Sequence, residues 1–339
     1  MPMINSASAI SASLASGKIV RDPVGFENGY WAGAPGAFYA ADERAWYLTY
    51  RIRRPRGVAP DRGGEARIAR SVDLQTWEDV WSVTKDKYNS ASIERSTILK
   101  GADGQWRYFT SYVDPADGRW CVLCLKSNDV RKFDPAQAKP IFKAASLDLE
   151  GVKDPWILAY DGAFYMFLSI ALPTTKTTQK SHSTLDIYNT GECLSATGLA
   201  ISRNLDNWQW QGVIFKPGAS GWDCYCRRIN SVVPYREKFL AFYDGSASHA
   251  ENYEEKTGLA VSSDLRRWQS LTPSSPLLTS PHGSGSLRYM DARPASENKD
   301  AASGMLSIFY EFARPDSAHD LRFATLSAES LFAGQIGGL

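Results

Sequence analysis

Long apolar runs and an excess of either charge are missing from this 339-residue sequence. Lys and Arg number 38 and Asp and Glu 37, and the formal net charge of +1 argues against a general nucleic-acid or anionic-membrane binder. No apolar run approaches the roughly 18 residues that a membrane helix needs. The first residues lack the basic segment and long apolar core of a signal peptide. We therefore expect a cytoplasmic protein without nucleic-acid or membrane partners, in which residues 1–24 form a mobile or loosely attached N-terminal tail.

The usual signals of a metal or cofactor site are also lacking. Five cysteines are an odd number and do not suggest a disulfide framework. Cys121 and Cys124 lie in the apolar run WCVLCL, where buried reduced thiols are favoured over a zinc site, and Cys224 and Cys226 are expected to be structural too. The four histidines have no metal-ligand spacing, and there is no phosphate-cradling Gly loop or Gly-x-Ser-x-Gly elbow. We therefore expect neither a metal nor a cofactor.

Aromatic residues and turn formers are abundant. The chain has 11 Trp, 16 Tyr and 14 Phe, together with 26 Gly and 17 Pro, which indicates many short strands joined by turns. Long amphipathic helical patterns are scarce. The Ala-rich N-terminus and the segment Leu326 to Phe332 are the places where short helices are expected.

A turn motif, Ser-x-Asp-Leu-x-x-Trp, recurs along the chain. Three copies and one degenerate copy read ARSVDLQTW, ISRNLDNW, VSSDLRRW and KSNDVRKF, and they end at Trp77, Trp208, Trp268 and Phe133. The Ser and Asp are expected to bond the turn backbone between two strands, and the aromatic residue to pack under the sheet. The motif therefore indicates architecture and not catalysis.

An aromatic strand recurs five times, at residues 44–50, 106–112, 163–169, 238–244 and 305–311. A period of roughly 60 residues with three or four strands per unit is typical of propellers. We predict an all-β, five-bladed β-propeller formed by residues 25–339 as one domain. The segment GKIVRDP around Lys18 is a candidate for completing the last blade.

The segment before each aromatic strand should be the innermost strand of its blade and line the central axis. All five segments carry charged or amide residues near their starts, and such residues are costly inside a closed fold unless they are paired or solvated. These residues are Glu27 and Asn28; Glu94 and Arg95; Lys153 and Asp154; Arg227, Arg228 and Asn230; and Arg288, Asp291 and Arg293. A shared polar pocket explains them, and so does a structural ion-pair network that plugs the channel.

The third of these segments resembles a known group of enzymes. GVKDPWILAYDGAFYMFLS, at residues 151–169, resembles the Asp-Pro strand of the five-bladed propeller glycoside hydrolases, the superfamily that includes families 43, 32, 62, 68, 117 and 130. The first blade, from AGAPGAFYA through YLTYR to ARSVDLQTW, resembles that of the family 130 mannoside phosphorylases. The resemblance covers nearly the whole chain at the level of blade pattern. It implies the propeller fold and a carbohydrate-active enzyme.

Departures from the family pattern imply a rearranged catalytic apparatus. Families 43 and 32 carry a catalytic Asp before a Pro in blade 1, where this chain has Ala34 and Pro35. The general-acid Glu of family 43 matches the run from Arg228 to Asn230, which holds no acid. Asp154 matches the blade 3 Asp, which in family 43 tunes the acid and orients the sugar. Glu94 matches the Glu of the family 130 run Glu-Asp-Pro-Arg, from which the Asp is lost here.

Glycosidic cleavage generally needs one carboxyl group to protonate the leaving oxygen and another to activate water or attack the sugar. We predict Asp154 and Glu94 as the central acids and Asp291 as the third. The predicted substrate-binding residues are Arg95, Arg227, Arg228, Asn230, Arg293, Trp31, Trp156, Asp244 and Glu311. Structural alternatives stand beside these roles: a turn cap for Asp154, neutralisation of Asp291 by Arg288 and Arg293, and blade packing for the tryptophans.

The resulting prediction is a glycoside hydrolase that acts on a short oligosaccharide or glycoside, with furanosides and mannosides as candidates. One alternative is a phosphorylase, in which inner-strand arginines bind the phosphate that replaces water. The other is a non-catalytic carbohydrate-binding propeller. Phosphate dependence would separate the first two, and a sugar-induced thermal shift without turnover would favour the third.

Overall fold

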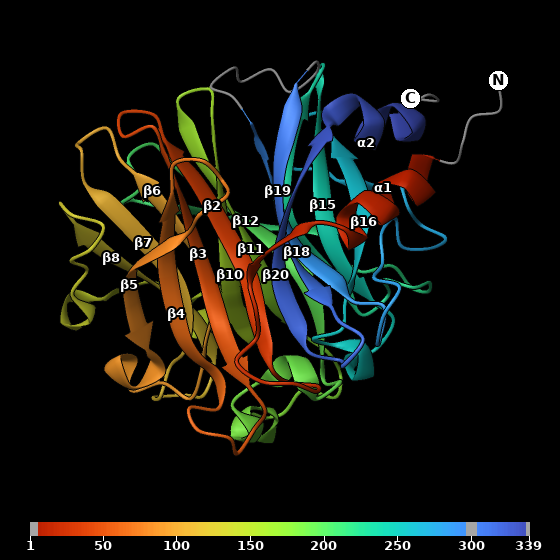
Figure 1. Cartoon of the computed structure of the whole chain (residues 1–339). Helices are drawn as coiled ribbons and strands as arrows, with labels where there is room; N and C mark the ends of the chain where they lie inside the picture. The colour runs from red at the N-terminus through yellow and green to blue at the C-terminus, as the bar shows by residue number, and fades with distance from the viewer. Residues whose placement is uncertain (1–5, 296–303, 337–339) are drawn as a thin grey trace, which may run out of the picture.

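The computed structural model describes residues 6–295 and 304–336, and these form five blades of antiparallel strands (Figure 1). The inner strands are β2 (Trp31–Ala40), β6 (Ile93–Lys100), β10 (Gly151–Tyr160), β14 (Cys226–Tyr235) and β18 (Leu287–Pro294). The second strands are β3 (Ala45–Arg54), β7 (Trp106–Val113), β11 (Ala163–Pro173), β15 (Lys238–Ser246) and β19 (Met305–Ala313). The third strands are β4 (Arg62–Ser71), β8 (Trp120–Ser127), β12 (Cys193–Ser202), β16 (Lys256–Ser262) and β20 (His319–Ser327). The outer strands are β5 (Glu78–Thr84), β9 (Lys139–Phe142), β13 (Gln209–Phe215), β17 (Gln269–Ser270) and β1 (Lys18–Arg21).

The inner strands close a ring. Each contacts its neighbours in the cyclic order β2, β6, β10, β14, β18 and back to β2. Strand β1 pairs antiparallel with β20, so the N-terminal segment around Lys18 supplies the outer strand of the last blade. The predicted five-bladed β-propeller is confirmed, and its first and last blades are joined through pairing of β20 with both β1 and β2.

The repeated turn motif joins neighbouring blades. Ser71 Oγ accepts from Leu74 N at 2.9 Å, and Asp73 accepts from two further turn amides, as predicted. Each motif aromatic then contacts the preceding blade: Trp77 lies against Phe309, 5.7 Å between ring centroids. The remaining pairs are Phe133 with Trp81, Trp208 with Phe109 and Trp268 with Phe167. The motif therefore holds the ring together, because every copy bridges two blades.

Helices form in both segments where they were expected, α1 (Ser6–Ala15) and α2 (Ala328–Ile336), and they lie side by side in Figure 1. Ile10 and Leu14 of α1 are buried in one core cluster with Leu331 and Phe332 of α2. The prediction of a loosely attached tail is therefore wrong for residues 6–15, because this segment contributes apolar side chains to the core. Residues 1–5 lie outside the described residues. No helix in the described part of the chain is long and apolar enough to cross a membrane.

The channel has two distinct ends. All five inner strands begin at the face that lies at the bottom of Figure 1, called here the lower face. Short 3-10 helices gather there, η1 (Lys85–Tyr88), η4 (Gln179–Thr184), η5 (Ile187–Asn189) and η6 (His249–Glu251). The inner strands end at the opposite, upper face. The remaining 3-10 helices are η2 (Pro135–Gln137), between β8 and β9, and η3 (Ala144–Leu147), between β9 and β10.

Candidate active site

Every inner strand contains a register shift near its start. The shifts enclose Ala34, Glu94, Asp154, Asn230 and Tyr289 in blades 1 to 5. Ala34, Asp154 and Tyr289 have left-handed backbone conformations, with φ of 53°, 54° and 52°. A bulge breaks the alternation of a strand and re-aims a side chain. The five bulges therefore bring side chains of all five blades to one level of the channel.

Asp154 lies at this level, and its carboxylate has few contacts with other polar side chains. Its exposed fraction is 2%, and Lys153 Nζ lies 3.3 Å from Oδ2. Its backbone N donates to Ser111 Oγ at 2.7 Å, which anchors the bulge to the neighbouring blade. Neither carboxylate oxygen has a hydrogen-bond partner among the described residues. Buried polar atoms are normally satisfied, so these oxygens are available to water or a ligand.

Arg95 and Asn230 reach each other across the channel. Arg95 Nη1 donates to Asn230 Oδ1 at 3.2 Å, and Arg95 Nε donates to the carbonyl of Pro35 at 2.9 Å. The second terminal nitrogen of Arg95 and the amide nitrogen of Asn230 are buried without a partner within the described chain. Both are donors, so this side of the channel can bind hydroxyl or anionic oxygen atoms.

Asp244 supplies a second carboxyl group from β15, directly opposite Arg228 in register. It accepts a hydrogen bond from the backbone N of Tyr289 at 3.0 Å, while its Oδ2 has no partner in the described residues. Burial raises the pKa of Asp244 to about 6, although Arg228 and Arg288 act against the shift. The charges of Asp244 and Asp154 both act on Arg228 and on Arg95, so these four residues belong to one axial cluster.

Glu94, in contrast, is held by two arginines. Arg51 Nε lies 2.8 Å and Arg53 Nη1 lies 3.0 Å from its carboxylate oxygens. Burial opposes ionisation, but the arginines outweigh it and lower the pKa of Glu94 to about 2. A carboxylate in this state is ionised at neutral pH and serves as a fixed counter-ion.

Glu94 is one end of an ion-pair belt that continues around the lower face. Glu311 pairs with Arg51 at 3.1 Å, with Arg288 at 2.6 Å and with His319 at 2.8 Å. Glu255 pairs with Arg288 at 2.7 Å and with Arg228. The Trp31 ring stacks on His319, with centroids 4.8 Å apart, and the guanidinium groups of Arg53 and Arg288 each lie 4.9 Å from it.

Three other predicted site residues lie further along the axis. Asp291 accepts from Trp156 Nε1 at 2.8 Å, from Arg293 Nε at 2.8 Å and from the backbone N of Ala37 at 2.6 Å. This carboxylate is thus occupied by three donors. Trp156 and Arg293 line a cavity at the upper face, at the opposite end of the inner strands from the axial cluster.

Arg227 points away from the axis. It forms two hydrogen bonds to Asp223, at 2.7 and 2.9 Å, and its guanidinium group lies 5.2 Å from the Phe215 ring of the outer strand of blade 3.

Lys153 and Tyr289 lie in the cluster although neither was predicted as a site residue. Their positions in the sequence could have identified them, because each lies beside or within the bulge of an inner strand.

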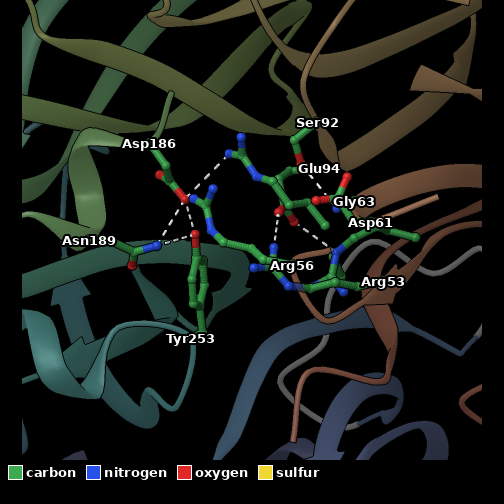
Figure 2. A network of polar contacts seen from close by, with 12 residues as sticks. Arg53, Arg56, Asp61, Gly63, Ser92, Glu94, Asp186, Asn189 and Tyr253 are labelled. Carbon is green, nitrogen blue, oxygen red and sulfur yellow. Dashed lines mark hydrogen bonds and ion pairs between the residues drawn. The ribbon is translucent and has the colours of Figure 1, made fainter. Parts of the chain in front are cut away.

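Three loops cover the lower face, as Figure 2 shows in part. Tyr253, from the β15–β16 loop, donates to Asp186 of the β11–β12 loop and accepts from Asn189 at 2.6 Å. Arg62, at the end of the β3–β4 loop, lies 3.6 Å from Asp186. Arg53 places its guanidinium group 4.3 Å from the centroid of the Tyr253 ring. We call these three loops the cap. The axial cluster beneath it is closed from solvent.

The described residues contain no cluster of metal-ligating side chains, and four of the five thiols are buried. In the described ranges, no group of three or more His, Cys, Asp or Glu could hold a metal ion. All five cysteines are free thiols, and Cys121, Cys124, Cys193 and Cys226 are buried as expected of structural residues. Burial raises the pKa of Cys121 to about 11 and that of Cys124 to about 12, so both remain protonated at neutral pH.

Comparison with known proteins identifies the fold. No family model and no curated protein matches the sequence. Many solved structures do match. A β-1,2-mannobiose phosphorylase from Listeria innocua superposes with a TM-score of 0.61 at 12% identity over 96% of each chain. An endo-arabinase from Bacteroides thetaiotaomicron VPI-5482 gives 0.59 at 13% identity over 89% of this chain and 97% of that one.

A thermostable family-43 glycoside hydrolase gives a TM-score of 0.58 at 14% identity, covering 87% of this chain and 89% of that one. The resemblance to the five-bladed propeller glycoside hydrolase superfamily is therefore confirmed at the level of fold. The chain has the fold that these hydrolases and phosphorylases share.

Proposed function

We propose that this protein is a carbohydrate-active enzyme that cleaves the glycosidic bond of a short oligosaccharide or glycoside. The observation that carries the proposal is a pair of buried carboxyl groups, Asp154 and Asp244, with unused oxygens in one axial cluster. Glycoside cleavage needs two carboxyl groups in different protonation states.

The two carboxyl groups have different proposed roles. Asp154 is the carboxylate that activates water or attacks the sugar, because Lys153 lies beside it and stabilises its negative charge. Asp244 is the general acid, since its pKa of about 6 leaves a useful protonated fraction near neutral pH. In this proposal Asp244 replaces Glu94 as the second central acid, because the Glu94 carboxylate is committed to Arg51 and Arg53.

Sugar recognition falls to the unused donors around the acids. Arg95 and Asn230 direct free nitrogen atoms into the cluster, and Arg228 Nε is likewise buried without a partner among the described residues. Sugar hydroxyls are both donors and acceptors, so they match a cluster that presents carboxylate oxygens and guanidinium nitrogens together.

Phosphorolysis is the second candidate, and the same arginines favour it. A guanidinium group binds phosphate well, and Arg95 offers a buried terminal nitrogen close to the proposed acids. Phosphate would then take the place of water. The solved phosphorylase with the same fold is consistent with this chemistry on a propeller of this kind.

The proposal is tested with a panel of p-nitrophenyl glycofuranosides and glycopyranosides, with and without phosphate. Asp154→Asn and Asp244→Asn should each lower kcat/KM about 10²–10⁴-fold. Asp161→Asn is the matched control, because Asp161 is exposed in the turn after β10, at the upper face. Phosphate dependence would select the phosphorylase. A sugar-induced thermal shift without turnover would contradict the enzyme proposal and favour a binding propeller.

A further inference from the structure

A cavity opens at the upper face, at the other end of the channel from the axial cluster. Its volume is about 700 Å³, and residues at the ends of all five inner strands line it. Small-molecule sites in proteins have volumes of about 300–1,000 Å³. The cavity is therefore large enough for a ligand, and the proposed cleavage site does not use it.

The walls of this upper cavity are aromatic and aliphatic. Phe38, Tyr39 and Trp46 contribute from blade 1, and Leu158 and Tyr160 contribute from the end of β10. Tyr160 has an exposed fraction of 42%, although it is a large aromatic residue. Several aromatic side chains around one hollow favour a ligand with a flat apolar body, because offset and edge contacts between rings add to the burial of apolar surface.

The floor of the cavity holds a positioned cation, Arg293. Its Nε donates to Asp291 at 2.8 Å, its Nη1 donates to the carbonyl of Ile157 at 3.3 Å, and its guanidinium group lies 4.4 Å from the Trp156 ring. Its side chain retains 18% exposure. Among the described residues, no hydrogen bond engages the second terminal nitrogen of Arg293. A guanidinium group fixed at three points is preorganised to donate a further hydrogen bond to a ligand.

The counter-ion of Arg293 at the floor is Asp291, 2.8 Å from its Nε. Asp291 also accepts from Trp156 Nε1 and from the backbone N of Ala37, so Arg293 is one of three donors to this carboxylate. The other charged residue of the lining, Asp161, is exposed to solvent, where its field is screened.

We propose that the upper cavity is a second binding site, which takes a small aromatic carboxylate. The ring lies between the aromatic walls, and the carboxylate accepts from Arg293 at the floor. This site is independent of the axial cluster and of the proposed cleavage reaction, so either proposal can fail alone.

The test is calorimetric titration of the full chain with naphthalene-2-carboxylate and with its neutral amide, naphthalene-2-carboxamide. The carboxylate should bind about tenfold more tightly than the amide. Ala159→Trp should abolish the binding of both, because Ala159 is exposed and lines the cavity. Ala159→Ser is the matched control and should bind like the wild type.

Charge recognition is tested at Arg293. Arg293→Gln should bind the carboxylate and the amide equally, and Arg293→Lys should keep part of the preference. Arg293→Gln removes the cation that pairs with Asp291. If this variant does not fold, Arg293→Lys, which keeps a cation, still tests the preference for the carboxylate over the amide. Equal binding of both probes by the wild type, unchanged binding in Ala159→Trp, or no binding at millimolar carboxylate would each overturn the proposal.

Discussion

The two ends of the channel differ sharply, although the same five strands build both. At the lower face, where the strands begin, bulges gather charged side chains that are buried beneath a cap. At the upper face, where the strands end, regular alternation continues and the channel widens into a cavity with aromatic walls. The difference shows that a bulge can convert the start of an ordinary inner strand into a polar site while its end stays apolar.

The largest expected effect comes from breaking the ion-pair belt at Arg288. This residue neutralises Glu255 and Glu311, all three being buried. Arg288→Ala removes one cationic partner from each of two buried carboxylates, so we expect a loss of about 3–5 kcal/mol in the free energy of unfolding. Urea denaturation measures it. Arg236→Ala is the control, since Arg236 is exposed and its pair with Glu329 should contribute at most about 1 kcal/mol.

A second effect is a pH dependence that originates at Asp244. Its pKa is about 6 in the folded chain against an ordinary value of 3.8, so the folded state binds more protons between these pH values. The contribution of this group to stability is present below pH 3.8 and is lost as the pH rises through 6. Asp244→Asn should remove this slope and stabilise the chain at pH 7 by about 2–3 kcal/mol.

The measurement is urea denaturation of wild type and Asp244→Asn at several pH values. The same variant should lose activity, so stability and activity move in opposite directions. A variant that is less stable than the wild type at pH 7 would show that Asp244 is held as a stabilising ion pair.

A smaller loss of stability is expected from a single substitution in the cap. Tyr253→Phe removes the hydroxyl group that joins the β15–β16 loop to Asp186 and Asn189 of the β11–β12 loop, and it keeps the ring that lies near Arg53. We expect a loss of about 1 kcal/mol. Hydrogen exchange of residues 247–255 should become faster while exchange in the inner strands stays unchanged. Equal exchange in both proteins would mean that this contact does not hold the cap closed.

The smallest effect is expected at the upper face. Tyr160→Ala removes an exposed side chain that contacts Phe239 edge-on, with ring centroids 5.0 Å apart. The free energy of unfolding should change by less than about 1 kcal/mol. Thermal denaturation of Tyr160→Ala and Arg288→Ala, each compared with the wild type, measures this difference in stability. A large loss here would show that the upper rim supports the fold and is not simply an open cavity wall.

Much of the architecture was predictable, and parts of the site were not. The blade period, the inner strands and the turn motif depend on local sequence, and the structure confirms them. A helix was predicted near the N-terminus, but its packing into the core was missed, because its Ala- and Ser-rich sequence has few apolar residues to signal burial. Asp154 was a predicted site residue, whereas Asp244 was assigned only to substrate binding, because its pKa depends on burial that the sequence does not reveal.

The sequence by itself determined the repeat, the propeller and the presence of polar residues on the inner strands, since hydrogen bonds within a turn and alternation along a strand act between near neighbours. Only the tertiary structure decided which of those residues meet. Glu94 pairs with Arg53 on the neighbouring blade, and Arg51 pairs with Glu311 from the far end of the chain. Asp291 and Arg293 lie two residues apart and share a hydrogen bond, yet Arg293 lines the upper cavity. Ring closure and the bulges set these partners, because they act across distances in sequence that no local pattern records.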